Sequence, residues 1–264
     1  MTKFNQTYST DLKYTEWQQI SEFFPTFQMG RPPKWEKWQV INAILYVNRS
    51  GCQWRMLPVN FPPWRTVYFY YWSWQRDGVW QRINEVLVKK VRTKAGRHER
   101  PSAAVIDSQS VKTSEGGEDV HKQTPGRKRH LVVDVLGLVL LVVVHSASIQ
   151  DGAGGLLTLQ QLFDHIKHSL HNRWCRLKLI WADGGYPSII DAVRQRFGWT
   201  LQIVKRSDDV KGFQVLPHRW VVERTFGWLC RYRRLARDYE HTTLSSESMV
   251  YIASSRRMLK MLAT

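Results

Sequence analysis

The spacing of the hydrophobic residues changes near residue 100, and this change constrains the fold more than any other feature of the sequence. Before it, apolar residues recur at helical intervals, and Pro or Gly follows most of these segments. The predicted helices are residues 15–24, 36–48, 64–75 and 80–91. The polar, basic stretch 89–101 is typical of a linker. We therefore expect a small, mostly helical domain with a linker over residues 1–100.

The chain beyond residue 100 alternates short runs of β-branched residues with helical segments. The predicted strands are residues 103–106, 131–136, 138–145, 177–182 and 200–205, and the predicted helices are residues 156–170, 188–197 and 217–235. Gly137 separates the second run from the third, which predicts a hairpin. Strands joined by turns and strands connected through helices together predict an α/β fold over residues 101–264, with a mixed sheet and flanking helices.

The composition is strongly basic. The 264 residues include 39 Lys and Arg against 22 Asp and Glu, so the formal net charge is +17. This excess favours a polyanionic partner, nucleic acid first. The longest apolar run, residues 135–144, is about half a membrane-spanning helix, residues 1–14 contain no apolar signal core, and the three cysteines stand far apart. We expect a soluble protein of a reducing, intracellular compartment, with no membrane partner.

Two aspartates follow predicted strands directly. Asp107 comes after the run 103–106, and Asp183 comes after 177–182 and before Gly184 and Gly185. Each alone is as easily explained as a turn or cap residue. Together they indicate a site, because ligands of open α/β sheets bind at the carboxyl ends of strands. Carboxylates that meet there are what a metal-dependent phosphodiester enzyme needs to hold a pair of divalent ions.

Glu223 is the third candidate acid. It lies four residues after Arg219 on the predicted helix 217–235, beside an apolar stripe formed by Val222, Phe226 and Leu229. We interpret it as a half-buried acid that points toward the sheet. The alternative is a solvent-facing Glu paired with Arg219, which helix statistics alone would favour.

Several basic residues are candidates for contact with a phosphate backbone. Arg224, Arg231 and Arg234 recur on one side of the predicted helix 217–235, and Arg127, Lys128 and Arg129 form a cluster that enters the predicted hairpin. Arg65 lies at the surface of the aromatic-rich helix 64–75. The alternatives are an ordinary solvated helix face and an exposed turn.

These segments resemble the bacterial insertion-sequence transposases of the IS5 group. The resemblance rests on residues 103–114 (AAVIDSQSVKTS), 126–140 (GRKRHLVVDVLGLVL), 180–186 (IWADGGY) and 218–240 (HRWVVERTFGWLCRYRRLARDYE). Residues 30–58 and 61–80 are similar to the helical domain that opens those proteins. The resemblance covers about residues 15 to 260, and it is the combination of segments that makes it specific.

The resemblance implies an RNase H-like catalytic domain with an Asp, Asp, Glu triad that binds two Mg²⁺ ions, for which Mn²⁺ can substitute. By motif, the triad is Asp107, Asp183 and Glu223. The family also has a Tyr seven residues before the Glu, an Arg four before it and a Lys seven after it. Arg219 matches, whereas Leu216 replaces the Tyr and Cys230 the Lys. Arg231 is the expected substitute for that Lys.

The expected function is that of a DNA transposase. The first domain would bind the terminal inverted repeats of the insertion sequence, and the second would catalyse metal-dependent strand cleavage and strand transfer into target DNA. By analogy we expect a homodimer or a larger assembly on double-stranded DNA, in the bacterial cytoplasm and associated with the nucleoid. The alternatives are a non-catalytic, sequence-specific DNA-binding protein that represses its element, and an RNase H-like nuclease without strand transfer.

Overall fold

The computed structural model describes residues 4, 6–24, 33–114, 118–119, 124–168, 176–204 and 220–263. Its helices are α1 (Tyr14–Gln18), α2 (Lys37–Ser50), α3 (Trp64–Arg76), α4 (Val79–Lys94), α5 (Asp151–His168), α6 (Ile190–Phe197), α7 (Trp220–Leu229) and α8 (Thr243–Ala263). Short 3₁₀ helices are η1 (Ser21–Phe23), η2 (Trp54–Met56), η4 (Pro187–Ile189) and η5 (Arg233–Leu235). The strands are β1 (Ala103–Lys112), β2 (Glu118–Asp119), β3 (Thr124–Asp134), β4 (Val139–Ser146), β5 (Leu179–Ala182) and β6 (Thr200–Ile203).

The first part of the chain is helical, as predicted. Helices α2, α3 and α4 form within two to three residues of the expected bounds, while the helix expected over 15–24 ends at Gln18 and is followed by η1. Gly51 ends α2 in the left-handed conformation, with φ of +73°. A Cβ at this position would lie 2.9 Å from Cβ of Arg233, so the close approach of η5 to α2 requires glycine here.

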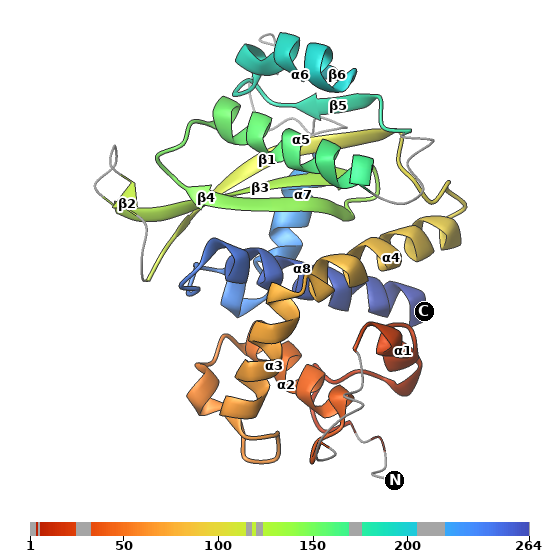
Figure 1. The fold of residues 1–264 in the computed structure, drawn as a ribbon, viewed down its shortest axis with the longest axis vertical. Helices are drawn as coiled ribbons and strands as arrows, with labels where there is room; N and C mark the ends of the chain where they lie inside the picture. The colour runs from red at the N-terminus through yellow and green to blue at the C-terminus, as the bar shows by residue number, and fades with distance from the viewer. Residues whose placement is uncertain are drawn as a thin grey trace.

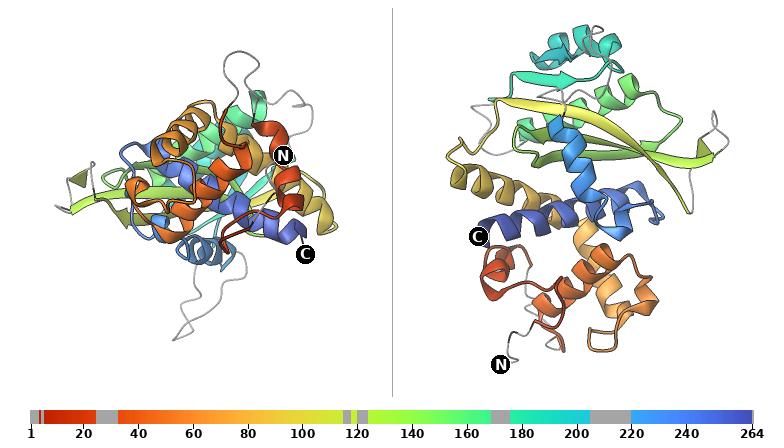
Figure 2. Two further views of the ribbon diagram at one scale, coloured as in Figure 1. Left: turned by 90° about the horizontal axis from the view of Figure 1, so that it is seen from below. Right: turned by 180° about the vertical axis from the view of Figure 1, so that it is seen from behind.

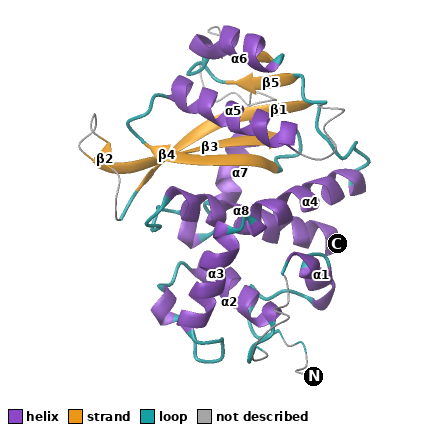
Figure 3. Ribbon diagram, in the orientation of Figure 1, coloured by secondary structure: helices purple, strands orange, loops and turns teal. Residues whose placement is uncertain are grey.

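Six strands of the described residues form one mixed sheet (Figure 3). The order is β2-β3-β1-β5-β6, with β4 paired to β3. Strand β1 is central: it runs antiparallel to β3 and parallel to β5, and β5 runs parallel to β6. The predicted hairpin is present, since β3 and β4 pair across a turn in which Gly137 has φ of +79°. This is the α/β, RNase H-like arrangement that the sequence predicts.

Both faces of the sheet are covered, which explains the continuous apolar runs of its strands. Alternate residues enter two different cores: Val105, Leu131 and Val133 lie in one, and Ala104 and Ile106 lie in the other. Helices α5 and α6 cover the second core, whereas α7 and α8 cover the first. Figure 2 shows α7 lying across the face of the sheet opposite α5.

Helix α8 was not anticipated from the sequence, and it joins the two parts of the chain. It packs against α4, α2 and β4, so the helical part and one face of the sheet share a continuous apolar core (Figure 1). Asn48 of α2 donates a hydrogen bond to the carbonyl group of Met249 on α8, and the Tyr71 hydroxyl contacts the carbonyl group of Ser245. The division at residue 100 therefore follows composition and matches no gap in the packing.

Two expected helix boundaries were wrong. The helix expected over 217–235 ends at Leu229, because the chain turns there and the carbonyl group of Leu235 accepts a hydrogen bond from Arg129. Helix α5 begins at Asp151, five residues before the expected start at residue 156. Asp151 is favourable there because a carboxylate in the first turn interacts well with the helix dipole.

Candidate active site

The parallel register of β1 and β5 leads toward Asp107 on one strand and Asp183 just after the other. Ala103 pairs with Leu179 and Val105 with Trp181, and the same offset of 179 − 103 = 76 positions separates Asp107 from Asp183. The paired residues end at Val105 and Trp181; the same register continued for two residues brings the two acids onto neighbouring strands, which are about 4.8 Å apart, and both acids raise the pKa of the Tyr186 hydroxyl. Strand β1 continues to Lys112, so Asp107 lies within a strand instead of ending one as predicted. Both side chains are half-buried.

Helix α7 crosses the face of the sheet to which Asp107 belongs. Val105, two residues earlier on β1, packs in the core that α7 covers, so the alternation of the strand assigns Asp107 to the same face. The N–H of Cys230 donates to the carbonyl group of Phe226, so residue 230 lies two turns after Glu223 on one side of the helix. Its Sγ accepts a hydrogen bond from Gln109, two residues after Asp107. Glu223 and Cys230 therefore lie on the side of α7 that runs along the face of β1 on which Asp107 and Gln109 lie.

The surroundings of Glu223 differ from the expectation. Its neighbour Val222 is fully buried, but the Glu223 side chain is exposed, so the prediction of a half-buried acid was wrong. The reason is that Val222, Thr225 and Phe226 already fill the contact between α7 and the sheet. Arg219, the other residue of the predicted pair, lies outside the described residues.

The donor set suits a hard cation, although it is not drawn together into a cluster. Asp107, Asp183 and Glu223 offer carboxylate oxygens, which are the ligands that Mg²⁺ prefers. In the described part of the chain, no three or more His, Cys, Asp or Glu side chains gather closely enough to hold a metal ion. The structure thus has Asp107 on β1, Asp183 just after β5, and Glu223 on the exposed side of α7.

A fourth acid lies close to Asp183. A Cβ built on Gly185 would lie 3.1 Å from Oδ1 of Asp183 and 3.5 Å from Cβ of Asp151, so both side chains approach the same point. The Ser108 hydroxyl donates to Oδ1 of Asp151 at 2.8 Å, and Nζ of Lys128 lies 3.1 Å from the same oxygen. Partial burial opposes ionisation, but Ser108 and Lys128 outweigh it and lower the pKa of Asp151.

This Asp151 contact ties the first turn of α5 to β1, one residue after Asp107. Asp151 is not among the three acids that the sequence predicts for the triad. The missed signal was its position five residues before the expected helix, where an acid acts as a first-turn residue.

His130, His145 and Tyr186 form a buried polar cluster next to Asp107, Asp151 and Asp183, the three acids that make up the acidic edge of the sheet. Nε2 of His145 lies 2.8 Å from Nδ1 of His130, and the two rings stack at 4.9 Å. Burial and the neighbouring His145 lower the pKa of His130 to about 4, so this pair is neutral near pH 7. Tyr186 packs edge-on against His130, and burial together with Asp107 raises the pKa of its hydroxyl. The cluster is therefore an uncharged support for the acids above it.

Three of the predicted DNA-binding residues are buried structural arginines, so their assignment to a DNA surface was wrong. Arg127 donates to the carbonyl groups of Glu240 and His241, Arg129 donates to those of Leu235 and Arg237, and Arg234 pairs with Glu240 at 2.6 Å. Each of these side chains is less than a tenth exposed. A guanidinium group that is already engaged by buried acceptors cannot reach a phosphate without breaking those contacts.

The other basic candidates keep surface access to different degrees. Arg65 and Arg231 are exposed, and Arg65 packs over the ring of Trp64. Lys128 is half-buried, since its Nζ donates to the carbonyl group of Ile149 and pairs with Asp151. Arg224 is half-buried beside Trp228. Arg231 does not continue the helix face of Arg224, because α7 ends before it.

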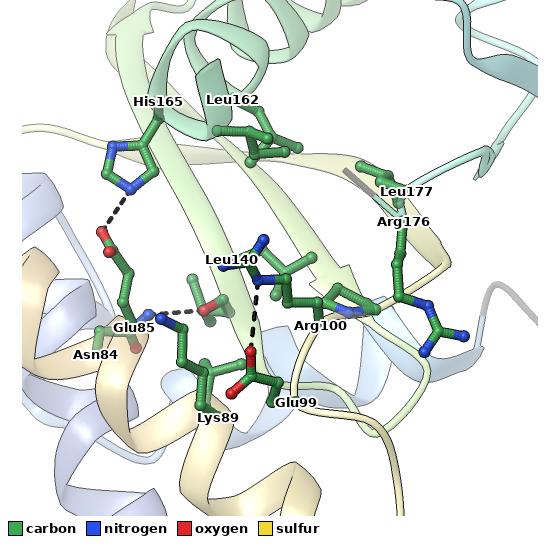
Figure 4. Close-up of a pocket in the computed structure, with 14 residues that line it drawn as sticks. Asn84, Glu85, Lys89, Glu99, Arg100, Leu140, Leu162, His165, Arg176 and Leu177 are labelled. Carbon is green, nitrogen blue, oxygen red and sulfur yellow. Dashed lines mark hydrogen bonds and ion pairs between the residues drawn. The ribbon is translucent and has the colours of Figure 1, made fainter. Parts of the chain in front are cut away.

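An apolar cavity of about 140 Å³ lies away from the acidic edge, between α4, α5 and β4 (Figure 4). His165 of α5 pairs with Glu85 of α4 at 2.6 Å across it, and Asn84 donates to the carbonyl group of Val139. None of the candidate acids lines this cavity. It is a gap between packed helices that the ion pair bridges.

Comparison with known proteins identifies the family. Residues 98–253, more than half of the chain, match the family model described as "Transposase DDE domain". The chain belongs to the DDE transposases. Residues 12–84 of this transposase also match the family described as "Putative transposase of IS4/5 family". The resemblance to the IS5 group is thereby confirmed.

Two relatives come from Burkholderia cepacia. The transposase is 32% identical over 139 residues to the "Putative transposase for insertion sequence element IS402", which covers 52% of this chain and 64% of that protein. It is 31% identical over 91 residues to the "Insertion element IS402 uncharacterized 16.2 kDa protein", which covers 32% of this chain and 58% of the relative. The chain thus spans less than two thirds of either protein. No solved structure matches it.

Within the ranges that the structure describes, no helix combines the length and the apolarity needed to cross a bilayer.

Proposed function

We propose that this DDE transposase mobilises its own insertion sequence by cutting DNA at the element ends and joining those ends to target DNA. The observation that supports the proposal is the parallel register of β1 and β5, which leads to Asp107 and Asp183 in a segment that matches the DDE domain. Glu223 would join them from α7, because Cys230, two turns later on that helix, contacts Gln109 of β1. Movement of the exposed Glu223 side chain would complete the triad.

In the proposed reaction, hydrolysis of a phosphodiester at the element end frees a 3′-hydroxyl group. That hydroxyl then attacks a target phosphodiester: a new bond forms between its oxygen and phosphorus, and the bond to the target 3′-oxygen breaks. Asp107, Asp183 and Glu223 would hold two Mg²⁺ ions, or Mn²⁺ in their place. Such ions, when bound, lower the pKa of the attacking group and stabilise the charge on the leaving oxygen.

Other parts of the chain would support this reaction. Ser108 and Lys128 fix Asp151 against the strand that carries Asp107, and they would keep this edge rigid. The net charge of +17 would supply most of the sequence-independent affinity for DNA. Helices α1 to α4 would recognise the terminal inverted repeats. Since two element ends must be joined, we propose that at least two chains act together, in the bacterial cytoplasm where the DNA is.

The test replaces each acid by its amide, as Asp107→Asn, Asp183→Asn and Glu223→Gln. Loss of a carboxylate that holds a catalytic ion removes several kcal/mol of transition-state stabilisation, so Mg²⁺-dependent cleavage and strand transfer should fall by about 10³-fold or more. DNA binding in EDTA should persist. Asp164→Asn is the matched control, because Asp164 is half-buried on α5, 13 positions or about 20 Å along the helix from Asp151, and its loss should leave cleavage unchanged.

Wild-type cleavage by any of the three variants would remove that residue from the triad. Stable, sequence-specific binding by the unaltered chain without cleavage in Mg²⁺ or Mn²⁺ would favour the repressor. Cleavage that needs no terminal repeat and never joins strands would favour the nuclease.

A further inference from the structure

A strongly basic cavity lies at the opposite end of α7 from the candidate active site. It has a volume of about 500 Å³ and lies between α2, the end of α7 and α8. Five basic residues line it: Arg49, Arg231, Arg256, Arg257 and Lys260. In the described part of the chain, no acidic residue lines it. Figure 1 shows α7 leading from the sheet to α8, so the cavity and Glu223 are connected by one helix.

Aromatic rings hold the arginines of this cavity in place. The guanidinium carbon of Arg257 lies 3.3 Å from the ring centroid of Trp228, and that of Arg224 lies 4.6 Å from the same ring. Arg49 lies over Tyr232 at 5.1 Å and donates to the carbonyl group of Arg231. Stacking engages the flat face of a guanidinium group and leaves N–H groups at its edge for a phosphate. Because the guanidinium groups already cover these rings, the cavity is better suited to an anion than to a stacked base.

The positive charge in the cavity is only partly compensated. Arg256 is buried and pairs with Glu16 at 2.7 Å; Glu16 also partly opposes the lowering of the Lys260 pKa, and Asp134 partly opposes that of the Arg257 pKa. Burial and the neighbouring Arg224 lower the pKa of Arg257 to about 10. Burial and Arg256 likewise lower the pKa of Lys260. Both directions mean that these cations are less stable here than in water, and a bound anion would relieve that cost.

We propose that this cavity binds the phosphodiester backbone of DNA that extends beyond the catalytic acids. The inference rests on the proposed function, which supplies DNA as the substrate, and it adds Arg49, Arg257 and Lys260 to the predicted contact residue Arg231. The size of the cavity exceeds what a single phosphate needs, and the exposed Arg231 and Lys260 side chains give it access to an extended chain. The bound groups are phosphates, so the contact is independent of base sequence.

The experiment measures how the affinity of the full chain for a 30-base-pair duplex depends on salt, in EDTA so that no cleavage occurs. The double variant Arg231→Gln with Lys260→Gln should lower the slope of log K against log salt by about two. The affinity in about 0.1 M salt should then fall about 60-fold. The matched control is Arg194→Gln with Arg196→Gln, which removes the same charge from the exposed side of α6 at the other end of the molecule and should change the slope much less.

A charge-preserving double variant, Arg231→Lys with Lys260→Arg, should retain the slope, and thermal unfolding checks that all variants are folded. Equal slopes for the glutamine double variant and the control would overturn the proposal. So would an unchanged slope combined with lost binding of inorganic tripolyphosphate, since the cavity would then be a small-anion site. These outcomes are independent of the amide variants of the catalytic acids, because binding is measured without any divalent ion.

Discussion

The buried ion pair of Arg234 and Glu240 provides a direct test of the structure, because the sequence predicts Arg234 to contact DNA and the structure buries it. Nε of Arg234 lies 2.6 Å from Oε1 of Glu240, and the side chains are 8% and 7% exposed. The Ser245 hydroxyl donates to the other carboxylate oxygen at 2.6 Å and contacts the Tyr71 hydroxyl at 2.7 Å. The network thus ties α3, η5 and the start of α8 together. We predict that Arg234→Met destabilises the fold.

The magnitude follows from what the variant leaves behind. Without Arg234, the buried Glu240 carboxylate loses its ion-pair partner, and breaking a buried pair in this way typically costs about 3–5 kcal/mol, or about a third of the stability of an ordinary domain. The exposed Arg231 is the matched control, and Arg231→Met should change the free energy of unfolding by no more than about 0.5 kcal/mol. Arg234→Met combined with Glu240→Gln should recover at least about 1 kcal/mol, because it removes the stranded charge and keeps an acceptor for Ser245.

Urea denaturation followed by tryptophan fluorescence measures all three variants. The salt dependence of DNA binding, measured on folded protein, completes the comparison: Arg231→Met should lower the slope by about one and Arg234→Met should not. If Arg234→Met were as stable as Arg231→Met and lowered the slope equally, Arg234 would be a surface contact. The basic helix face expected from the sequence would then be correct, and the structural assignment would be refuted.

Two further predictions concern groups enclosed by α5 and α8. Burial raises the pKa of Glu247 from 4.5 to about 7, so the folded protein holds this proton more tightly than the unfolded chain and loses about 3 kcal/mol of stability as pH rises across that range. Glu247→Gln should therefore stabilise the protein by about 2–3 kcal/mol more at pH 8 than at pH 5 in urea denaturation, and a pH-independent effect would contradict this. Gly154→Ala should destabilise it by about 1–3 kcal/mol, because the added Cβ would overlap His145 and lie 2.6 Å from Cε1 of His130. At Gly227, an added Cβ would meet no described atom within 4 Å, so Gly227→Ala should instead stabilise the protein by up to about 1 kcal/mol. Urea denaturation measures both variants, and similar effects of Gly154→Ala and Gly227→Ala would contradict the close packing of Gly154 against His130 and His145.

Much of the local structure was predictable because it depends on residues close in sequence. Continuous β-branched and apolar runs predicted the start of β1 and the β3–β4 hairpin, and helical spacing predicted α2, α3 and α4. The two acids that follow the expected strands were also found from local pattern. Their adjacency follows from a parallel register in which the residues that precede each acid pair in step. The start of α5 at Asp151 was not predicted, since an acid next to Gly occurs both in turns and in the first turn of a helix.

The roles of individual charged residues depended on partners distant in the chain. Nothing near Arg129 in the sequence indicates that the carbonyl groups of Leu235 and Arg237 will accept its hydrogen bonds. Likewise, Arg231 and Arg234 are three positions apart and chemically identical, yet one is exposed and the other is buried against Glu240.

The sequence by itself determined most of the helices and strands before α8, the family and the identity of the candidate acids, because hydrophobic periodicity and motif spacing are properties of contiguous residues. Only the tertiary structure decided which cations reach the surface, and it brought α8 beneath the sheet to join the two parts and build the basic cavity. The physical reason is that a buried guanidinium group needs acceptors in fixed positions, and those acceptors come together only when the whole chain has folded.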